Sequence, residues 1–165
     1  MKLELLEQHR WLERLAGEWS VEGECSTGPD QPPVTTEMRE SARMMGGAWL
    51  LAEGSGEMPG GGAMASLMQL GYDPAKGKFV GTFAASMMSH LWTYEGSLDP
   101  SGKILTLDTV GPSFADPAAA TPGAMTKYQD IIEIVDADHR VMRSRMLGPD
   151  GEWRPVMTAR YRRRL

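Results

Sequence analysis

The first residues of the chain have the periodicity of an amphipathic helix. The residues of one helical face recur at steps of three and four: Leu5, Leu6, His9, Leu12 and Leu15. Charged residues occupy the other faces, as they do on a surface helix that buries one side. The pattern predicts a helix over about residues 3–16, which Gly17 ends because glycine adopts the left-handed conformation at little cost.

From residue 17 onward the pattern changes to short segments in which apolar and polar residues alternate. Such alternation is typical of strands that bury one face, and the Gly, Pro and Asp residues between the segments predict tight turns. Gly46-Gly47, for example, suits a two-residue hairpin. Ten strands are expected, at approximately residues 17–26, 33–45, 48–57, 64–72, 78–87, 90–98, 103–110, 124–135, 140–147 and 153–163.

Many antiparallel strands joined by tight turns form either a sandwich or a barrel. An unbroken meander favours the barrel, because each strand can pair with its predecessor and the last strand can close on the first. We therefore expect a single all-β domain over residues 1–165, with an antiparallel β-barrel over about 17–163 and the short helix at one end. A longer loop at 111–123 is expected to cover an opening or to contact a partner.

Composition and charge narrow the class of protein. The chain has 165 residues, of which 41% are hydrophobic and 24% charged, and this suits one folded domain. The net charge is −5, with eight Arg and two acidic residues among the last 26 residues and an acidic remainder. Broad nucleic-acid binding is not expected, because it needs cations over a whole face. With no apolar run of roughly 20 residues, no leader and a lone Cys25, we expect no membrane span and a cytoplasmic location.

Several short motifs resemble those of a known group of barrels. The segment Leu15-Ala16-Gly17-Glu18-Trp19 is similar to the Gly-x-Trp start of lipocalin-like, or calycin, barrels. Further matching positions are His9, Leu12, Gly46-Gly47, Gly71-Tyr72-Asp73-Pro74, Gly77-Lys78-Phe79 and Tyr161-Arg162. Together, from about residue 9 to 163, they resemble an uncharacterised bacterial family of lipocalin-like domains of unknown function. The resemblance implies the barrel fold, but it implies no particular activity, because the family has none that is established.

The resemblance also implies how the barrel closes. In calycin barrels an Arg near the end of the last strand packs across the Trp of the first strand. Arg160 or Arg162 is therefore expected to stack its guanidinium on the indole of Trp19, in a structural role. Several family-like sequences carry an aromatic residue and an acid where this chain has Phe83 and Ala85, so a polar function at those positions is not expected here.

Alternation predicts which side chains face the barrel interior. On the first strand the inward face carries Trp19 and Cys25, and the buried thiol is expected to be inert. On the second strand Met38 and Met44 share a face, on which Glu40 also falls. A carboxylate inside a barrel needs a partner or a raised pKa. Glu40 is therefore paired with an internal Arg, returned to solvent by a bulge, or functional.

The sixth predicted strand carries the densest group of chemically active side chains. His90, Trp92 and Tyr94 alternate along it and should share one face. If they point inward, they give a cavity an aromatic wall, an imidazole and a phenol. If they point outward, they form an aromatic stripe suited to a homodimer contact.

The chain has thirteen Met residues, most of them on the predicted strands, where flexible thioethers either line an adaptable pocket or fill a wide core. The sequence predicts non-covalent binding of a small apolar or amphipathic molecule inside the barrel, with Glu40 or His90 fixing a polar head group. The candidate ligand-binding residues are Trp19, Met38, Glu40, Met44, Met68, Phe83, His90, Trp92, Tyr94 and Met157.

Two alternatives stay open. In the first, side chains fill the barrel and the protein has a structural role or acts as a homodimer. In the second, a calycin-type enzyme uses Glu40 and His90 as acid and base. The sequence lacks the motifs of zinc sites, serine nucleophiles, phosphate loops and dinucleotide sites, so we expect no metal and no cofactor. A haem held by a late His, as in some calycin barrels, would require His139, which is expected in a turn.

Overall fold

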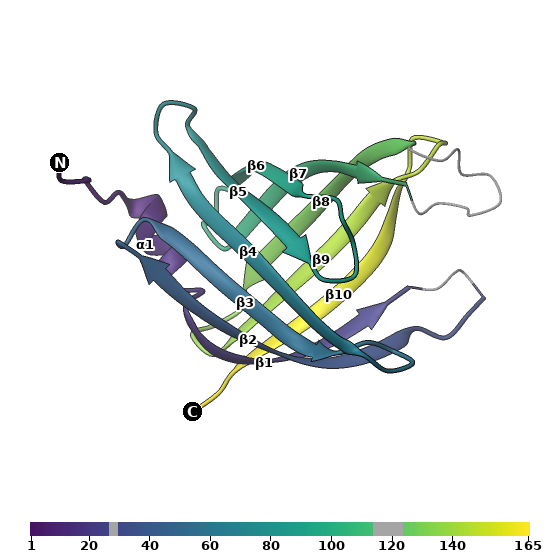
Figure 1. Cartoon of the computed structure of the whole chain (residues 1–165). Helices are drawn as coiled ribbons and strands as arrows, with labels where there is room; N and C mark the ends of the chain where they lie inside the picture. Colours follow the sequence, from purple (N-terminus) through teal and green to yellow (C-terminus); the bar gives the residue numbers. More distant parts are fainter. Residues whose placement is uncertain (27–29, 114–123) are drawn as a thin grey trace.

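The computed structural model describes residues 1–26, 30–113 and 124–165 and shows one short helix followed by ten strands (Figure 1). The helix, α1, spans Glu7–Glu13. The strands are β1 (Gly17–Cys25), β2 (Val34–Met45), β3 (Trp49–Glu57), β4 (Ala63–Asp73), β5 (Lys78–Ala85), β6 (Trp92–Leu98), β7 (Ile104–Pro112), β8 (Met125–Ile134), β9 (His139–Leu147) and β10 (Trp153–Arg163). Most of the loop predicted at 111–123 lies outside the described residues.

The strands form a closed antiparallel barrel, which confirms the predicted meander. Every strand from β2 to β10 pairs with its predecessor, and β1 pairs with β10 to close the ring. The hairpin between β2 and β3 turns at Gly46 and Gly47, whose φ angles are 61° and 74°. Two successive positive φ angles are what a two-residue turn between right-twisted strands requires, so the glycine pair fixes this corner.

The N-terminal helix is shorter than the predicted 3–16. It begins after Leu6, whose backbone N–H donates to Nδ1 of His9 (2.9 Å), and it ends at Glu13. Leu5 lies outside the helix, where it remains 39% exposed and contacts Gly47 in the turn between β2 and β3. No helix in the described ranges has the length and hydropathy to cross a membrane. The buried residues of the helical segment are His9, Trp11, Leu12 and Leu15.

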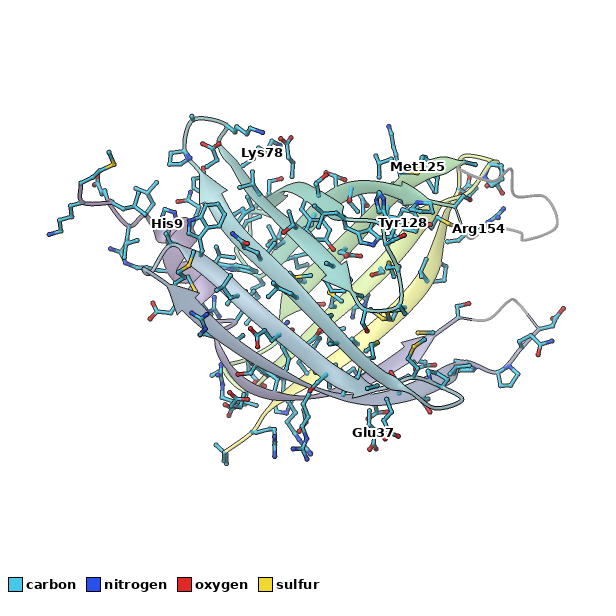
Figure 2. All side chains as sticks on the ribbon, in the orientation of Figure 1. His9, Glu37, Lys78, Met125, Tyr128 and Arg154 are labelled. Atoms are coloured by element: carbon cyan, nitrogen blue, oxygen red, sulfur yellow. The ribbon has the colours of Figure 1, made fainter. Side chains whose placement is uncertain are left out.

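The interior of the barrel differs between its two ends, which Figure 2 marks with His9 on α1 at one end and Met125 and Arg154 at the other. Toward α1 the interior is packed with side chains that have almost no exposed surface: Leu12, Leu15, Trp19, Leu50, Leu70, Phe79, Leu105, Leu107 and Ile132. At the opposite end, inward-facing side chains keep accessible surface: Thr36, Met38, Met64, Ser66, Phe83 and Met157. We call these six the mouth residues. The α1 end is closed by packed side chains. At the opposite end, Trp92, Tyr128 and Met146 are buried, and the mouth residues are packed less tightly.

The wall of the barrel is bonded less completely between β6 and β7 than elsewhere. β6 begins at Trp92, so His90 precedes the strand instead of lying in it as predicted. The register between β6 and β7 covers only the pairs from Glu95–Asp108 to Leu98–Leu105. The first part of β6 therefore lies beside the last part of β7 without register pairs between them.

Candidate ligand-binding site

Trp19 belongs to the closed end of the barrel. Its indole is 1% exposed, and Nε1 donates to the Leu15 carbonyl (3.0 Å). The guanidinium of Arg163 lies 4.3 Å from the centroid of the indole and donates to the carbonyls of Ala16 (2.7 Å) and Ala137 (3.0 Å). An Arg on the last strand therefore closes the barrel over Trp19, as the resemblance implies.

The Arg in that position is Arg163, and the prediction of Arg160 or Arg162 is wrong. Both of these side chains are exposed, and Arg160 forms an ion pair with Glu24 (3.5 Å). The register explains the difference, because Trp19 lies directly opposite Arg163 and neighbouring residues of a strand point to opposite faces. With Arg163 on it, Trp19 is a structural residue at the floor of the barrel.

Glu40 faces the interior, as its position in the second strand predicted, and it has a cationic partner. Its carboxylate accepts a hydrogen bond from Arg140 in an ion pair whose side chains are 12% and 5% exposed. The guanidinium carbon of Arg140 also lies 3.8 Å from the ring centroid of Tyr161 and 4.8 Å from that of Trp19. Burial raises the pKa of Glu40, and the charge of Arg140 opposes that rise. Within the fold, the negative charge of Glu40 is compensated.

A second carboxylate, Asp130 on β8, lies inside the barrel and has no cationic partner among the described residues. One carboxylate oxygen accepts a hydrogen bond from the Tyr94 hydroxyl and the other from the Ser144 hydroxyl, both at 2.5 Å. Burial raises the pKa of Asp130, while these two hydrogen bonds lower it. The pKa of Tyr94 is raised by burial and by the charge of Asp130. We call these three residues the Asp130 cluster. Asp130 and Ser144 face each other in the register of β8 and β9 and keep some accessible surface.

Trp92 and Tyr94 share the inward face of β6. Their side chains are 7% and 3% exposed, so they do not form the outward stripe considered for a homodimer contact. His90 lies in the loop before the strand, with its ring edge-to-face against Trp92 at 4.8 Å between centroids. Its Nε2–H donates to the Val110 carbonyl (3.0 Å), which links this loop to β7 where the register between β6 and β7 has ended.

The structure does not bring Glu40 and His90 together. Glu40 is bonded to Arg140 on β9, whereas His90 is bonded to the backbone of β7. The acid–base pair that the enzyme alternative requires is therefore not assembled.

The remaining candidates divide between the two ends. Met38, Phe83 and Met157 are mouth residues and pack partly against the core. Met68 is buried on β4, opposite Phe83 in the register with β5. Met44 is half-buried near the end of β2, beside the hairpin at the α1 end, and so lies apart from the mouth.

Sequence reasoning missed the polar interior residues on β8 and β9. Alternation on β8 places Asp130 on the face of the buried Ile132, and alternation on β9 places Arg140 and Ser144 on the face of the buried Met142. The signal that identified Glu40, a polar residue in register with an apolar face, was thus present for these residues as well. Applied to every strand, it would have identified Arg140, Asp130 and Ser144 as inward-facing residues, although not the pairs that they form.

Metal and thiol chemistry have little support in the structure. Among the residues that are described, no group of three or more His, Cys, Asp or Glu could hold a metal ion. His139 is exposed at the start of β9, and its Nδ1–H donates to the Asp136 carboxylate (2.9 Å). Burial raises the pKa of the Cys25 thiol, which keeps it protonated and unreactive near neutral pH.

Comparisons with solved structures find the same architecture in other proteins. The crystal structure of Rv2717c from M. tuberculosis aligns over 98% of this chain and 100% of that chain, with 14% identity and a TM-score of 0.61. The S-type phycobiliprotein lyase CPES from Guillardia theta aligns over 97% of this chain and 94% of that chain, with 12% identity and a TM-score of 0.53. At such identities the similarity shows the fold alone, a lipocalin-like barrel. The comparison with curated protein sequences finds no match.

A comparison with protein families gives a match over almost the whole chain. Residues 4–163 match the family described as "Protein of unknown function (DUF1579)". The match covers α1 and all ten strands of the barrel, and it extends slightly beyond the residues on which the resemblance in the sequence rested. The chain belongs to the DUF1579 family, whose members share a domain of unknown function.

Proposed function

We propose that the chain binds a small apolar or amphipathic molecule, non-covalently, in the half of the barrel interior that opens at the mouth residues. The observation that carries this proposal is the change in packing along single strands. On β5, Phe79 is 2% exposed near α1, whereas Phe83, four residues further along the same face, is only half-buried. Apolar surface that stays accessible inside a barrel is surface that a ligand can remove from water.

The chemistry of the mouth suits an apolar body of variable shape. Met38, Met64 and Met157 contribute flexible, polarizable thioethers, and Phe83 contributes a ring. Removing apolar ligand surface from water stabilises a complex by about 25 cal/mol per Å² before the cost of association is subtracted. Deeper in the barrel, the Asp130 cluster supplies the few polar groups that orient a ligand.

A neutral, environment-sensitive dye such as Nile red tests the proposal. We expect saturable binding by the purified chain, with a rise in fluorescence as the dye leaves water. Met38→Asp places a short charged side chain in the mouth and should weaken dye binding at least tenfold, because a carboxylate cannot be buried against the dye without a partner.

Thr35→Asp is the matched control. Thr35 precedes Met38 on β2 and is exposed on the outer face, so the same charge is added outside the lumen. This variant should bind the dye as the wild type does, and circular dichroism should show that both variants are folded. If the wild type does not bind the dye, or if the two folded variants lose binding equally, the lumen is not the binding site and the proposal fails.

A further inference from the structure

The ionisable groups inside the barrel leave one negative charge uncompensated. Among the described residues, Glu40 and Arg140 face the interior as an ion pair, so their charges cancel. Asp130 forms hydrogen bonds to Tyr94 and Ser144, and neither hydroxyl brings a positive charge. No ion pair to Asp130 occurs in the described part of the chain. An ionised Asp130 therefore lacks the cation that a buried carboxylate normally has.

A second unsatisfied polar group lies next to this carboxylate. The Thr109 hydroxyl on β7 is buried and has no hydrogen-bond partner within the described chain. In the register of β7 and β8, Leu107 lies opposite Asp130 and Thr109 lies opposite Tyr128. Thr109 and Asp130 are thus diagonal neighbours on the inward face, a separation that a small head group can bridge.

The same place is where the barrel wall is least completely bonded. The register between β6 and β7 ends at Glu95–Asp108, next to Tyr94 and Thr109. A hollow of the outer surface lies over this part of the wall, and its lining includes Tyr94 and Thr109 as well as outward-facing residues of both strands. Tyr94 and Thr109 therefore border a hollow of the outer surface, while Asp130 and Ser144 lie on the inner side of this wall.

Building on the proposed function, we propose that the ligand carries a protonated amine and that Asp130, with Tyr94, Ser144 and Thr109, binds this head group. An ammonium group supplies both things that Asp130 lacks, a positive charge and additional N–H donors for its remaining lone pairs. The Thr109 hydroxyl accepts another of those donors. An anionic head group meets a like charge at Asp130. The charge of Arg140 is paired with Glu40, although its Nε–H has no hydrogen-bond partner among the described residues.

Three probes with the same alkyl chain test this inference: octylamine, octanol and octanoate. Each is titrated against Nile red bound to the wild-type chain near neutral pH. We expect octylamine to displace the dye at least tenfold more tightly than octanol, a difference of about 1.4 kcal/mol, and octanoate to be the weakest. In Asp130→Asn the preference for octylamine over octanol should fall below about threefold, while the affinity for octanol changes little.

The matched control is Asp108→Asn, on the neighbouring strand. Asp108 is exposed on the outer face, where it accepts a hydrogen bond from Gln129, so this variant loses the same charge outside the lumen. It should keep the wild-type preference. If both variants lose the preference for octylamine equally, the preference arises from the net charge of the protein, and the inference is overturned.

If Asp130→Asn fails to fold, titration of the three probes against the wild type still tests the amine subsite. The amine subsite is overturned if the three probes displace the dye equally, if octanoate is preferred, or if none displaces bound dye. The proposal of a ligand-binding lumen is not affected by these results. Failure of the wild type to bind Nile red is a different result, since it removes the proposed function itself.

Discussion

Glu40 and Asp130 are both carboxylates inside one barrel, yet their surroundings differ in kind. Glu40 is bonded to a guanidinium that is itself held between Trp19 and Tyr161, above the packed end of the barrel. Asp130 is bonded to two hydroxyls, beside an unsatisfied Thr109 and close to the least completely bonded part of the wall. The charge of Glu40 is paired within the fold, although the Nε–H of Arg140 has no hydrogen-bond partner among the described residues, whereas Asp130 has no cationic partner among them.

The difference shows how a buried charge can be assigned a role. A charge that the fold neutralises with its own residues contributes to specifying the structure and offers nothing to a ligand. A charge that the fold desolvates without neutralising has a cost in stability, and a ligand of opposite sign removes that cost on binding. The following predictions change one side of this comparison at a time.

Replacing Arg140, the cation that is paired with Glu40, should have the largest effect on stability. Arg140→Met leaves Glu40 buried without a partner and should lower the free energy of unfolding by about 3–5 kcal/mol. Adding Glu40→Met should recover most of this loss, because the pair is then replaced by apolar side chains of similar length. Chemical denaturation of the two variants measures both values. A double variant no more stable than Arg140→Met would contradict the compensated pair.

Arg163→Ala tests the closed end of the barrel. The change removes hydrogen bonds to the carbonyls of Arg14, Ala16 and Ala137 together with the contact to Trp19, and it should destabilise the fold by about 2 kcal/mol. Arg162→Ala, the exposed neighbour, should change stability by no more than about 0.5 kcal/mol. Thermal unfolding of both variants compares them, and equal shifts would mean that Arg163 does not close the barrel.

Asp130→Asn should have a smaller effect on stability, and one that depends on pH. Because burial raises the pKa of Asp130, the folded chain holds a proton that the unfolded chain releases above about pH 3.9. The stability that Asp130 contributes is therefore fully present below that pH and is lost as pH rises through its folded-state pKa.

Asn has no such dependence, so the stability of Asp130→Asn relative to wild type should rise with pH, by about 1 kcal/mol toward neutral pH. Urea denaturation at several pH values between 4 and 8 measures the trend, with Asp108→Asn as the control for the lost charge. A relative stability that falls with pH would show that Asp130 is compensated by a cation after all.

The barrel could be predicted from the sequence because it depends on local patterns. Period-two alternation and turn residues such as Gly46-Gly47 define the strands, and strands in an unbroken meander can close on themselves. The inward position of Glu40 follows from the same alternation. The helix was predicted too long because periodicity counts Leu5 as a helical core residue, whereas it lies outside α1, partly exposed, against Gly47.

The site could be predicted only in part, because it depends on pairing between distant strands. Arg163 was missed because the choice among neighbouring arginines depends on the register of β10 against β1. The partnership of Glu40 with Arg140 joins residues 100 positions apart, which no local pattern connects. His90 was assigned to a strand by alternation, whereas β6 starts only at Trp92.

The most direct test of the account is the location of a bound amine. Octylamine titrated into the isotope-labelled chain, followed by NMR of the backbone amides, reports which residues it approaches. The account predicts saturable shifts concentrated beside Tyr94, Asp130 and Ser144 and extending toward the mouth residues. Shifts that never saturate, or that gather on the acidic outer hollow beside Glu18 and Glu53, would contradict it.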